Sequence, residues 1–277
     1  IARHVTGDDS IFYGRASGLD TVAEHSGLLL VFGALAPRTA QVEAGGVARH
    51  RLEESLRAIK SKGVRVVLIS PRRDDIPDWV KAEWLPIAPA TDAALILAMA
   101  YEIVAAGRQD HAFLARCCSG AEAFLAYLTG ASDGTPKTAE WAAAISDIPA
   151  KQIRALATDY AATRSLITMS WSLQRAVHGE QPWWSAIAIA CIAGQMGLPG
   201  GGVTFGVGSV GTGWAEMTEY ELGKKCVVKK RPGYWAGDGV LDEVHYIDHG
   251  DDPAAHVAAL SSKQVDGIWE VQTAQID

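Results

Sequence analysis

Charged and hydroxyl side chains are concentrated in a few short segments that each follow an apolar run. Arginines in these segments could hold a pyrophosphate through charge-assisted hydrogen bonds, and acids could accept hydrogen bonds from a guanine edge or a ribose hydroxyl. The arginines are Arg38, Arg72 and Arg73, and the acids are Asp74 and Asp92. This chemistry favours a nucleotide-containing ligand. The sequence has no G-x-G-x-x-G, so the nicotinamide fingerprint is excluded.

Each segment also has an ordinary structural interpretation. Thr91 could be an N-cap, with Asp92 as an acid in the first helical turn. Residues 72–75 could be a solvated turn with local ion pairs, and residues 199–202 could simply end a helix. A lone histidine such as His178 is more often a surface or core residue than a catalytic one. Taken singly, none of these segments supports a function.

The elements that must position these segments begin with a strand, helix and strand. Residues 28–33 are an apolar run closed by glycine, which predicts a strand buried on both faces. Residues 49–62 have one apolar face, and residues 64–71 are rich in β-branched side chains, so a helix and a second strand follow. Such a crossover connects parallel strands and is right-handed.

The same alternation continues to about residue 206. Residues 84–87 and 165–171 are predicted strands, and residues 91–106 are predicted to form a long apolar helix. Shorter helices are predicted at residues 110–118, 120–129, 138–146 and 149–162. A helix over residues 182–196 is predicted to direct Trp184, Ile187, Cys191 and Ile192 inward.

This pattern predicts an α/β fold with an open, mostly parallel sheet and helices on both faces, similar to a Rossmann fold. Ligands of such sheets lie beyond the carboxyl ends of the strands. We therefore expect residues 34–39, 70–75 and 171–181 to share one edge of the sheet.

Composition narrows the class of protein. The 277 residues carry a net charge of -7 with scattered Lys and Arg, which disfavours nucleic-acid binding. No apolar run approaches the roughly 20 residues that a membrane span needs, so membrane insertion is not expected. The four cysteines show no metal-ligand spacing and are interpreted as buried thiols, so no metal site is assigned.

The sequence pattern changes after Gly206. A glycine-rich stretch is followed by short strands of alternating pattern and by one predicted helix near residues 253–262. We expect two domains, residues 1–207 and residues 208–277. The second is predicted to be a small mixed α+β segment.

A long set of motifs resembles one enzyme family. Residues 169–181 read MSWSLQRAVHGEQ and lead to GLPGGG at residues 197–202. These motifs resemble the molybdopterin oxidoreductases of the dimethyl sulfoxide reductase family, and within it the biotin sulfoxide and trimethylamine N-oxide reductases. Matching segments are residues 43–50, 69–75, 89–95, 113–117, 126–134 and 137–142.

The resemblance implies a cofactor, bis-molybdopterin guanine dinucleotide with molybdenum, and the reduction of an S-oxide or N-oxide by oxygen-atom transfer. By similarity, Trp171, Ser172, Gln174 and Arg175 would line one pterin and the substrate funnel, with His178 and Gln181 flanking them. Ser70, Arg73 and Asp92 would lie beside a guanine nucleotide. Two departures affect the nucleotide contacts: Ala36-Pro37 and Ser70-Pro71 stand where many relatives have Asn-Pro and Asp-Pro.

No catalytic residue is assigned within the chain. In the resembling branch an upstream serine ligates molybdenum, and that region would precede Ile1. The chain is therefore expected to be a central fragment of a bacterial enzyme of the cytoplasm or periplasm, inactive alone.

A second resemblance concerns residues 211–277. Segments within residues 220–225, 231–235, 241–244, 254–260 and 265–269 resemble an oligopeptide-type solute-binding protein of an ABC transporter. This leaves two alternatives open, an extracytoplasmic peptide-binding protein or a chimera of the two families. A third alternative is an insertion peculiar to the reductase, with Tyr234 and Trp235 as core aromatics.

Overall fold

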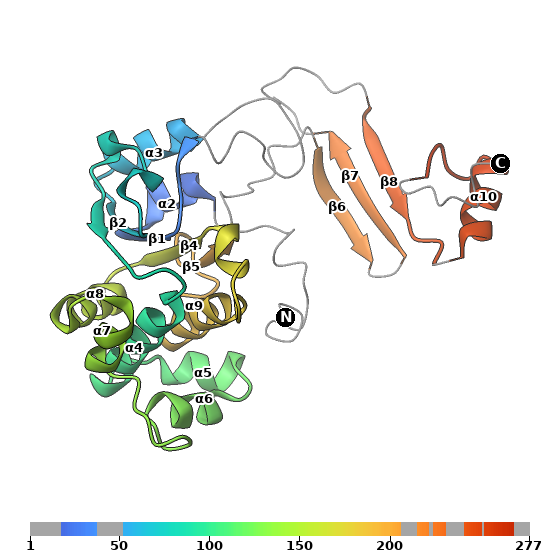
Figure 1. Ribbon diagram of the computed structural model, residues 1–277. Coiled ribbons are helices and arrows are strands. Elements are labelled where there is room, and N and C mark those ends of the chain that lie inside the picture. Colours follow the sequence, from blue (N-terminus) through green and yellow to red (C-terminus); the bar gives the residue numbers. More distant parts are fainter. Residues whose placement is uncertain are drawn as a thin grey trace. The chain divides into compact units, whose positions relative to one another are not determined.

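The computed structural model describes residues 18–37, 52–205, 215–221, 224–230, 241–250 and 252–268. The chain divides into two compact units, residues 1–211 and residues 212–277 (Figure 1). Several residues singled out in the sequence lie outside the described residues, namely Arg38, Thr39, residues 43–50, the stretch 206–213, Tyr234, Trp235 and Trp269.

The first unit is built on a five-stranded parallel sheet with the strand order β3-β2-β1-β4-β5. The strands are β1 (Leu28–Phe32), β2 (Arg65–Ile69), β3 (Glu83–Leu85), β4 (Ser165–Met169) and β5 (Gly202–Phe205). The open parallel sheet predicted from the sequence is confirmed. Strand β5 was not predicted, because its four residues follow a proline–glycine segment that by itself indicates a helix end.

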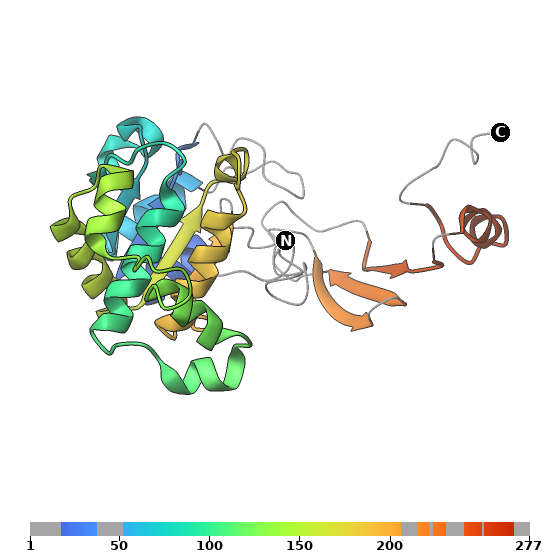
Figure 2. The ribbon, with the colours of Figure 1, turned by 60° about the horizontal axis from the view of Figure 1, so that its bottom comes forward.

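Helices cover both faces of this sheet, as predicted (Figures 1 and 2). One face packs against α2 (Leu19–His25) and α3 (Leu52–Ser61). The other packs against α4 (Asp92–Ala105), α7 (Ala139–Ser146), α8 (Ala150–Ala162) and α9 (Gln181–Ile192), with α5 (His111–Cys117) and α6 (Ala121–Leu128) at its margin.

Successive side chains of a strand point to opposite faces of the sheet, so each strand contributes to the two cores, one on each face. In β1, Leu28, Leu30 and Phe32 join the core under α4 and α9, while Leu29 and Val31 join the core under α2 and α3. All five side chains are buried, because successive strand residues point to opposite faces and both faces are covered.

The structure corrects the predicted inward face of α9. Trp184 is 42% exposed, whereas its neighbour Trp183 is 8% exposed. Ile187 and Ile192 are buried as predicted, but Trp184 and Cys191 lie on the helix flank that lines a cavity. The helix starts at Gln181, and its buried face is centred on Trp183, Ala186 and Ala190, at helical spacing.

The interpretation of the cysteines as buried thiols is also wrong. All four are free, Cys117 is exposed, and Cys118, Cys191 and Cys226 are half-buried. Cys117 is the last residue of α5 and Cys118 is its C-cap, and Cys118 packs in part against the core. Cys191 also packs in part against this core, on the flank of α9 that lines a cavity.

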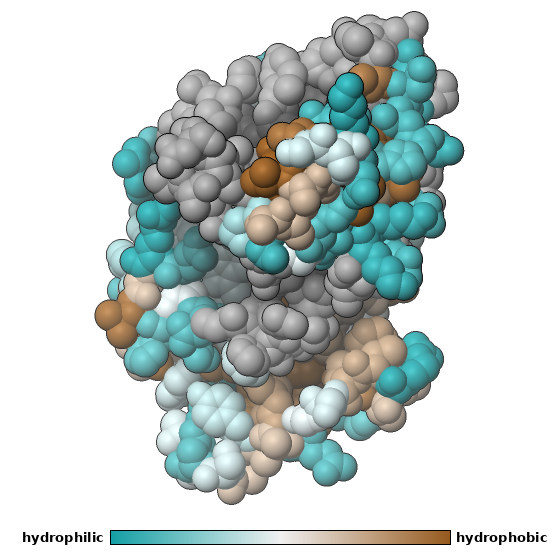
Figure 3. Space-filling model, turned by 90° about the vertical axis from the view of Figure 1, so that its right-hand side faces the viewer, coloured by the Kyte–Doolittle hydropathy of each residue, from teal (hydrophilic) through white to brown (hydrophobic). Residues whose placement is uncertain are grey.

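The second unit contains a three-stranded antiparallel sheet of β6 (Ala215–Glu221), β7 (Lys225–Lys230) and β8 (Glu243–Ile247). The helix α10 (Pro253–Ser261) follows, and the Asp252 side chain caps it by accepting a hydrogen bond from the Ala254 N–H. Several apolar side chains of this unit are exposed, and Figure 3 shows apolar and hydrophilic side chains interspersed on the face that it draws. No helix among the described residues is long and apolar enough to cross a membrane.

Candidate functional site

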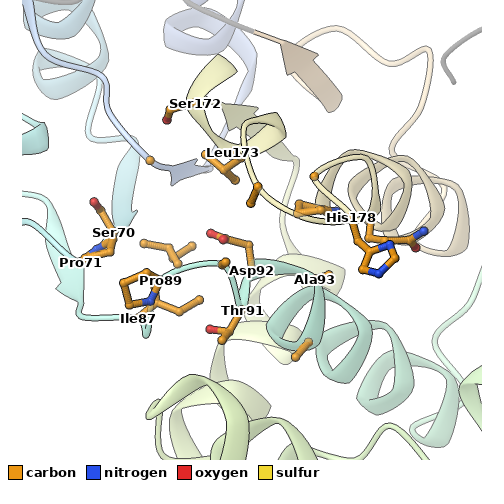
Figure 4. Close-up of a pocket in the computed structure, with 18 of the residues that line it drawn as sticks. Ser70, Pro71, Ile87, Pro89, Thr91, Asp92, Ala93, Ser172, Leu173 and His178 are labelled. Atoms are coloured by element: carbon orange, nitrogen blue, oxygen red, sulfur yellow. The ribbon is translucent and has the colours of Figure 1, made fainter.

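A cavity of about 870 Å³ lies at the carboxyl edge of the parallel sheet. Its walls come from the segments that follow β1, β2, β3 and β4 and from the start of α4 and α9. Residues 34–37, 70–75 and 171–181 follow neighbouring parallel strands, so they share one edge, as predicted from the sequence. Figure 4 shows Ser70 and His178 at opposite ends of the cavity, which suits an extended ligand.

Five of the nine predicted site residues line this cavity: Ser70, Asp92, Ser172, His178 and Gln181. The other four are described but are not part of its wall: Arg73, Trp171, Gln174 and Arg175. Arg72 takes the place that was expected for Arg73. The binding roles assigned to all nine residues remain predictions.

Asp92 is the most unusual residue of the cavity wall. It is the first residue of α4, it is only 7% exposed, and its carboxylate points into the cavity (Figure 4). Burial raises the pKa of this carboxyl from 3.8 to about 6, and the hydrogen bond from its own backbone N–H offsets part of that rise. No other described residue donates a hydrogen bond or forms an ion pair to it. A buried acceptor of this kind favours a ligand that donates hydrogen bonds.

Thr91 occupies the N-cap position of α4, but its side chain does not cap the helix as the ordinary structural interpretation expects. Its hydroxyl donates to the Ala88 carbonyl at 2.6 Å. The Thr91 carbonyl accepts from the N–H groups of Ala94 and Leu95. Since the hydroxyl closes the preceding loop, the first turn of α4 carries no side-chain cap and faces the cavity.

Ser70 shapes its loop. It is 1% exposed, and its hydroxyl donates to an Asp75 carboxylate oxygen at 2.5 Å while accepting from the Arg72 backbone N–H at 3.2 Å. The Trp84 indole N–H donates to the Ser70 carbonyl at 2.9 Å. These bonds fix the course of the loop at the end of β2, so Ser70 positions its neighbours at the cavity wall.

Arg72 and Asp74 form an exposed ion pair with two hydrogen bonds, at 2.9 and 2.6 Å. The structural alternative of a solvated turn with local ion pairs is therefore correct for these two residues. Arg72 still lines the cavity, and an exposed ion pair contributes little to stability, so its guanidinium can exchange Asp74 for an anionic ligand.

Two residues of the cavity wall have a strained backbone. Ala90 and His178 both have left-handed conformations, with φ of 62° and 58°, and both line the cavity. A left-handed conformation costs about 1 kcal/mol for a residue other than glycine. Such residues cluster at ligand sites, where surrounding structure holds them in place. The sequence offered no signal for Ala90, because alanine does not indicate a left-handed turn.

Gly33 marks the closest approach between two loops. Its φ is +82°, and a Cβ atom at this position would lie 2.6 Å from the Ser170 Cβ atom and 2.9 Å from the Leu173 Cδ1 atom. Only glycine lets the chain leave β1 beside the segment that follows β4. Gly179 has a similar role, since its Cβ atom would lie 2.2 Å from the Gln174 carbonyl oxygen.

We predict that Gly33→Ala lowers the free energy of unfolding by about 3 kcal/mol, since left-handed strain adds to a clash between two loops. Gly63→Ala is the matched control. Gly63 has a φ of +74°, but no atom lies within 4 Å of its added Cβ atom, so the expected loss is about 1 kcal/mol. Urea denaturation of both variants measures the difference. Equal losses would show that the approach at Gly33 is not tight.

Comparison with known proteins places the chain in a family. A family model described as molybdopterin oxidoreductase matches residues 15–266. The chain belongs to the molybdopterin oxidoreductase family. It is 59% identical over 218 residues to a biotin sulfoxide reductase of Cereibacter sphaeroides, which covers 79% of this chain and 29% of that protein.

Two further relatives are more distant. A dimethyl sulfoxide/trimethylamine N-oxide reductase of Cereibacter sphaeroides is 41% identical, and a trimethylamine-N-oxide reductase of Haemophilus influenzae is 36% identical. Each match covers 73% of this chain and 24% of the relative. Among solved structures, the acetylene hydratase from Pelobacter acetylenicus matches with a TM-score of 0.46 and 21% identity, covering 69% of this chain and 23% of that one.

These matches confirm the first resemblance and give no support to the second. The chain spans less than a third of the length of these curated relatives. The family match continues to residue 266, so it includes most of the second unit, and neither a solute-binding protein nor a chimera is supported. The two-domain boundary near residue 207 remains a prediction.

Enzymes of this family and type use molybdenum with molybdopterin guanine dinucleotide. The cavity fits the nucleotide part of this cofactor. Its volume is within the range of about 300–1,000 Å³ that ligand sites occupy. It offers a buried acceptor at Asp92, a cation at Arg72 and the first turn of α4.

Proposed function

We propose that this chain holds the guanine nucleotide end of the cofactor in an enzyme that reduces S-oxides or N-oxides. The observation that carries the proposal is the buried carboxylate of Asp92, which faces the cavity and accepts no hydrogen bond from any other described residue. A guanine base presents two adjacent N–H donors on its Watson–Crick edge, and a carboxylate accepts both. An adenine base lacks this pair of donors, so Asp92 discriminates between the two bases.

Charge complementarity supports the orientation of the nucleotide. Arg72 lies on the β2 side of the cavity wall. Phosphate oxygens bind to guanidinium groups. The Arg72 side chain thus neutralises a phosphate while Asp92 binds the base.

The loop between β4 and α9 is assigned to the reacting end of the site. It is held by η5 (Trp171–Gln174), by the contact of the Trp171 ring with the Trp183 ring at 5.4 Å between centroids, and by the close packing at Gly179. Arg175 follows η5 with an exposed side chain, free of ion pairs and side-chain hydrogen bonds among the described residues. A donor of this kind binds and orients the oxygen atom of an oxide substrate.

The molybdenum cofactor, when bound, supplies the redox chemistry of oxide reduction. The residues of this chain bind the cofactor and orient the substrate. The substrate class follows from the relatives, whose names specify biotin sulfoxide, dimethyl sulfoxide and trimethylamine N-oxide.

Nucleotide discrimination tests this proposal. We expect the chain at pH 8 to bind guanosine diphosphate at least about tenfold more tightly than adenosine diphosphate, as measured by isothermal titration calorimetry, because one well-placed pair of hydrogen bonds discriminates by about 1–3 kcal/mol. Equal affinities for the two nucleotides would contradict the assignment of Asp92 to the base.

The affinity for guanosine diphosphate should also depend on pH. The ionised carboxylate accepts both hydrogen bonds, and the pKa of Asp92 is about 6 before the ligand binds. Lowering the pH from 8 to 5 should therefore weaken binding by about tenfold, one factor of ten for each pH unit below the pKa. Affinity that stays constant between pH 8 and pH 5 would show that an ionised Asp92 does not bind the base.

A further inference from the structure

A second cavity, of about 990 Å³, lies between α5, α6 and α9. It adjoins the first cavity, since Leu97, Tyr127 and Gln181 line both. Its wall is mostly apolar, but three of the four cysteines belong to it: Cys117, Cys118 and Cys191. The proposed function uses none of these thiols.

Cys118 and Cys191 belong to different helices, α5 and α9, which pack against each other. Cys118 caps the end of α5 with an extended backbone, and Cys191 is in the last turn of α9. The helices are joined by the hydrogen bond from the Asp110 N–H to the Ile192 carbonyl, at 2.8 Å. Both thiols are half-buried in the same cavity wall.

Both side chains also pack against the core cluster to which α5 and α9 contribute. Burial, together with the nearby thiols of Cys118 and Cys117, raises the pKa of the Cys191 thiol to about 12. Cys117 is exposed, and as the chain neighbour of Cys118 its side chain diverges from it, so these two do not pair without distorting the backbone.

We propose that Cys118 and Cys191 form a dithiol site that hydrogen peroxide converts to a disulfide linking α5 to α9. Peroxide oxidises the Cys118 sulfur to a sulfenic acid and leaves as one water molecule. The Cys191 sulfur then attacks the Cys118 sulfur, the S–OH bond breaks, and the hydroxide leaves with the Cys191 proton as a second water molecule. The two thiols lose two electrons and two protons in total, and peroxide accepts them. A dithiol reductant reverses the step by thiol–disulfide exchange.

Once formed, the disulfide would fix α9 against α5, and α9 begins at Gln181, in the wall that the two cavities share.

Peptide mapping of the oxidised chain tests the pairing. The folded chain is treated with hydrogen peroxide, alkylated without reduction, digested and analysed by mass spectrometry. We expect a linked pair of peptides that contain Cys118 and Cys191, lost on treatment with dithiothreitol, and a rise in melting temperature of about 5 °C or more, because the link closes a long loop. Cys117→Ser and Cys226→Ser are the matched controls and should leave the linked pair unchanged, whereas Cys118→Ser and Cys191→Ser should abolish it.

Three results would overturn the proposal: linkage of Cys117 to Cys191 in place of Cys118, linkage that forms only in urea, or full alkylation of both thiols after peroxide treatment. A second measurement does not depend on the folding of any variant. Phenylarsine oxide, which bridges paired thiols, should protect Cys118 and Cys191 together from alkylation in the unmodified chain. Protection of neither thiol would also count against the site.

Discussion

Asp92→Asn should raise the melting temperature of the protein at pH 8 by about 5 °C and lower its affinity for guanosine diphosphate at least about tenfold. The Asp92 carboxyl is ionised at this pH although it is buried, and its raised pKa measures what that costs the folded state. The shift from 3.8 to about 6 corresponds to about 3 kcal/mol, and loss of the favourable charge at the start of α4 returns about 1 kcal/mol. A net gain of about 2 kcal/mol gives the expected shift in melting temperature.

The gain should depend on pH in a defined direction. A carboxyl group whose pKa is higher in the folded state than in the unfolded state takes up its proton first in the folded state, so it contributes stability at low pH that is lost as the pH rises. For Asp92 this contribution is complete below about pH 4 and lost above about pH 6. The advantage of the asparagine variant should therefore shrink between pH 6 and pH 4.

Thermal melts at pH 8, 6 and 4 measure this dependence. Asp78→Asn is the control, because Asp78 is an exposed acid at the start of the short helix η4 (Asp78–Val80). That variant should keep the melting temperature and the nucleotide affinity of the parent at every pH. If the melting temperature of Asp92→Asn at pH 8 is equal to that of the parent or lower, then Asp92 is a structural residue of α4.

Arg175→Ala should lower kcat/KM for oxide reduction by about a hundredfold in a full-length reductase that contains this segment, with a melting temperature within about 1 °C of the parent. The side chain is exposed and makes no ion pair or side-chain hydrogen bond among the described residues, so its removal leaves the folded state unchanged. What is lost is a donor for the bound oxide.

Two variants sharpen this prediction. Arg116→Ala removes an exposed arginine of α5, away from the loop after β4, and should leave the activity unchanged. Arg175→Lys keeps the charge but loses the forked donor geometry, so it should restore only part of the activity. Equal losses of activity and stability in Arg175→Ala would assign Arg175 a structural role.

The framework of the fold follows from local sequence patterns. Strands β1, β2 and β4 are apolar on both faces, and a helix with one apolar face follows β1, so a parallel sheet with helices on both faces was predictable. Strand β5 was missed because its four residues carry no periodicity of their own. They become a strand only by pairing with β4.

The site was less predictable than the fold, because burial and hydrogen bonding there depend on loops far apart in the sequence. Ser70 was expected beside the nucleotide, but its hydroxyl donates to Asp75 within the same loop. Asp92 is buried because segments that follow several strands form the cavity wall around it, so no local sequence pattern indicates its burial. Trp184 was misplaced because helix α9 is apolar on nearly every side, so its pattern does not reveal which face packs on the sheet.

The most direct test of the nucleotide assignment is a crystal structure of the chain with guanosine diphosphate. We expect electron density for the nucleotide in the cavity at the carboxyl edge of the five-stranded sheet, with the two N–H donors of the guanine edge within about 3 Å of the Asp92 carboxylate oxygens and a phosphate within reach of Arg72. Density for the base in another part of the protein, or at the same edge with the guanine turned away from Asp92, would contradict the account.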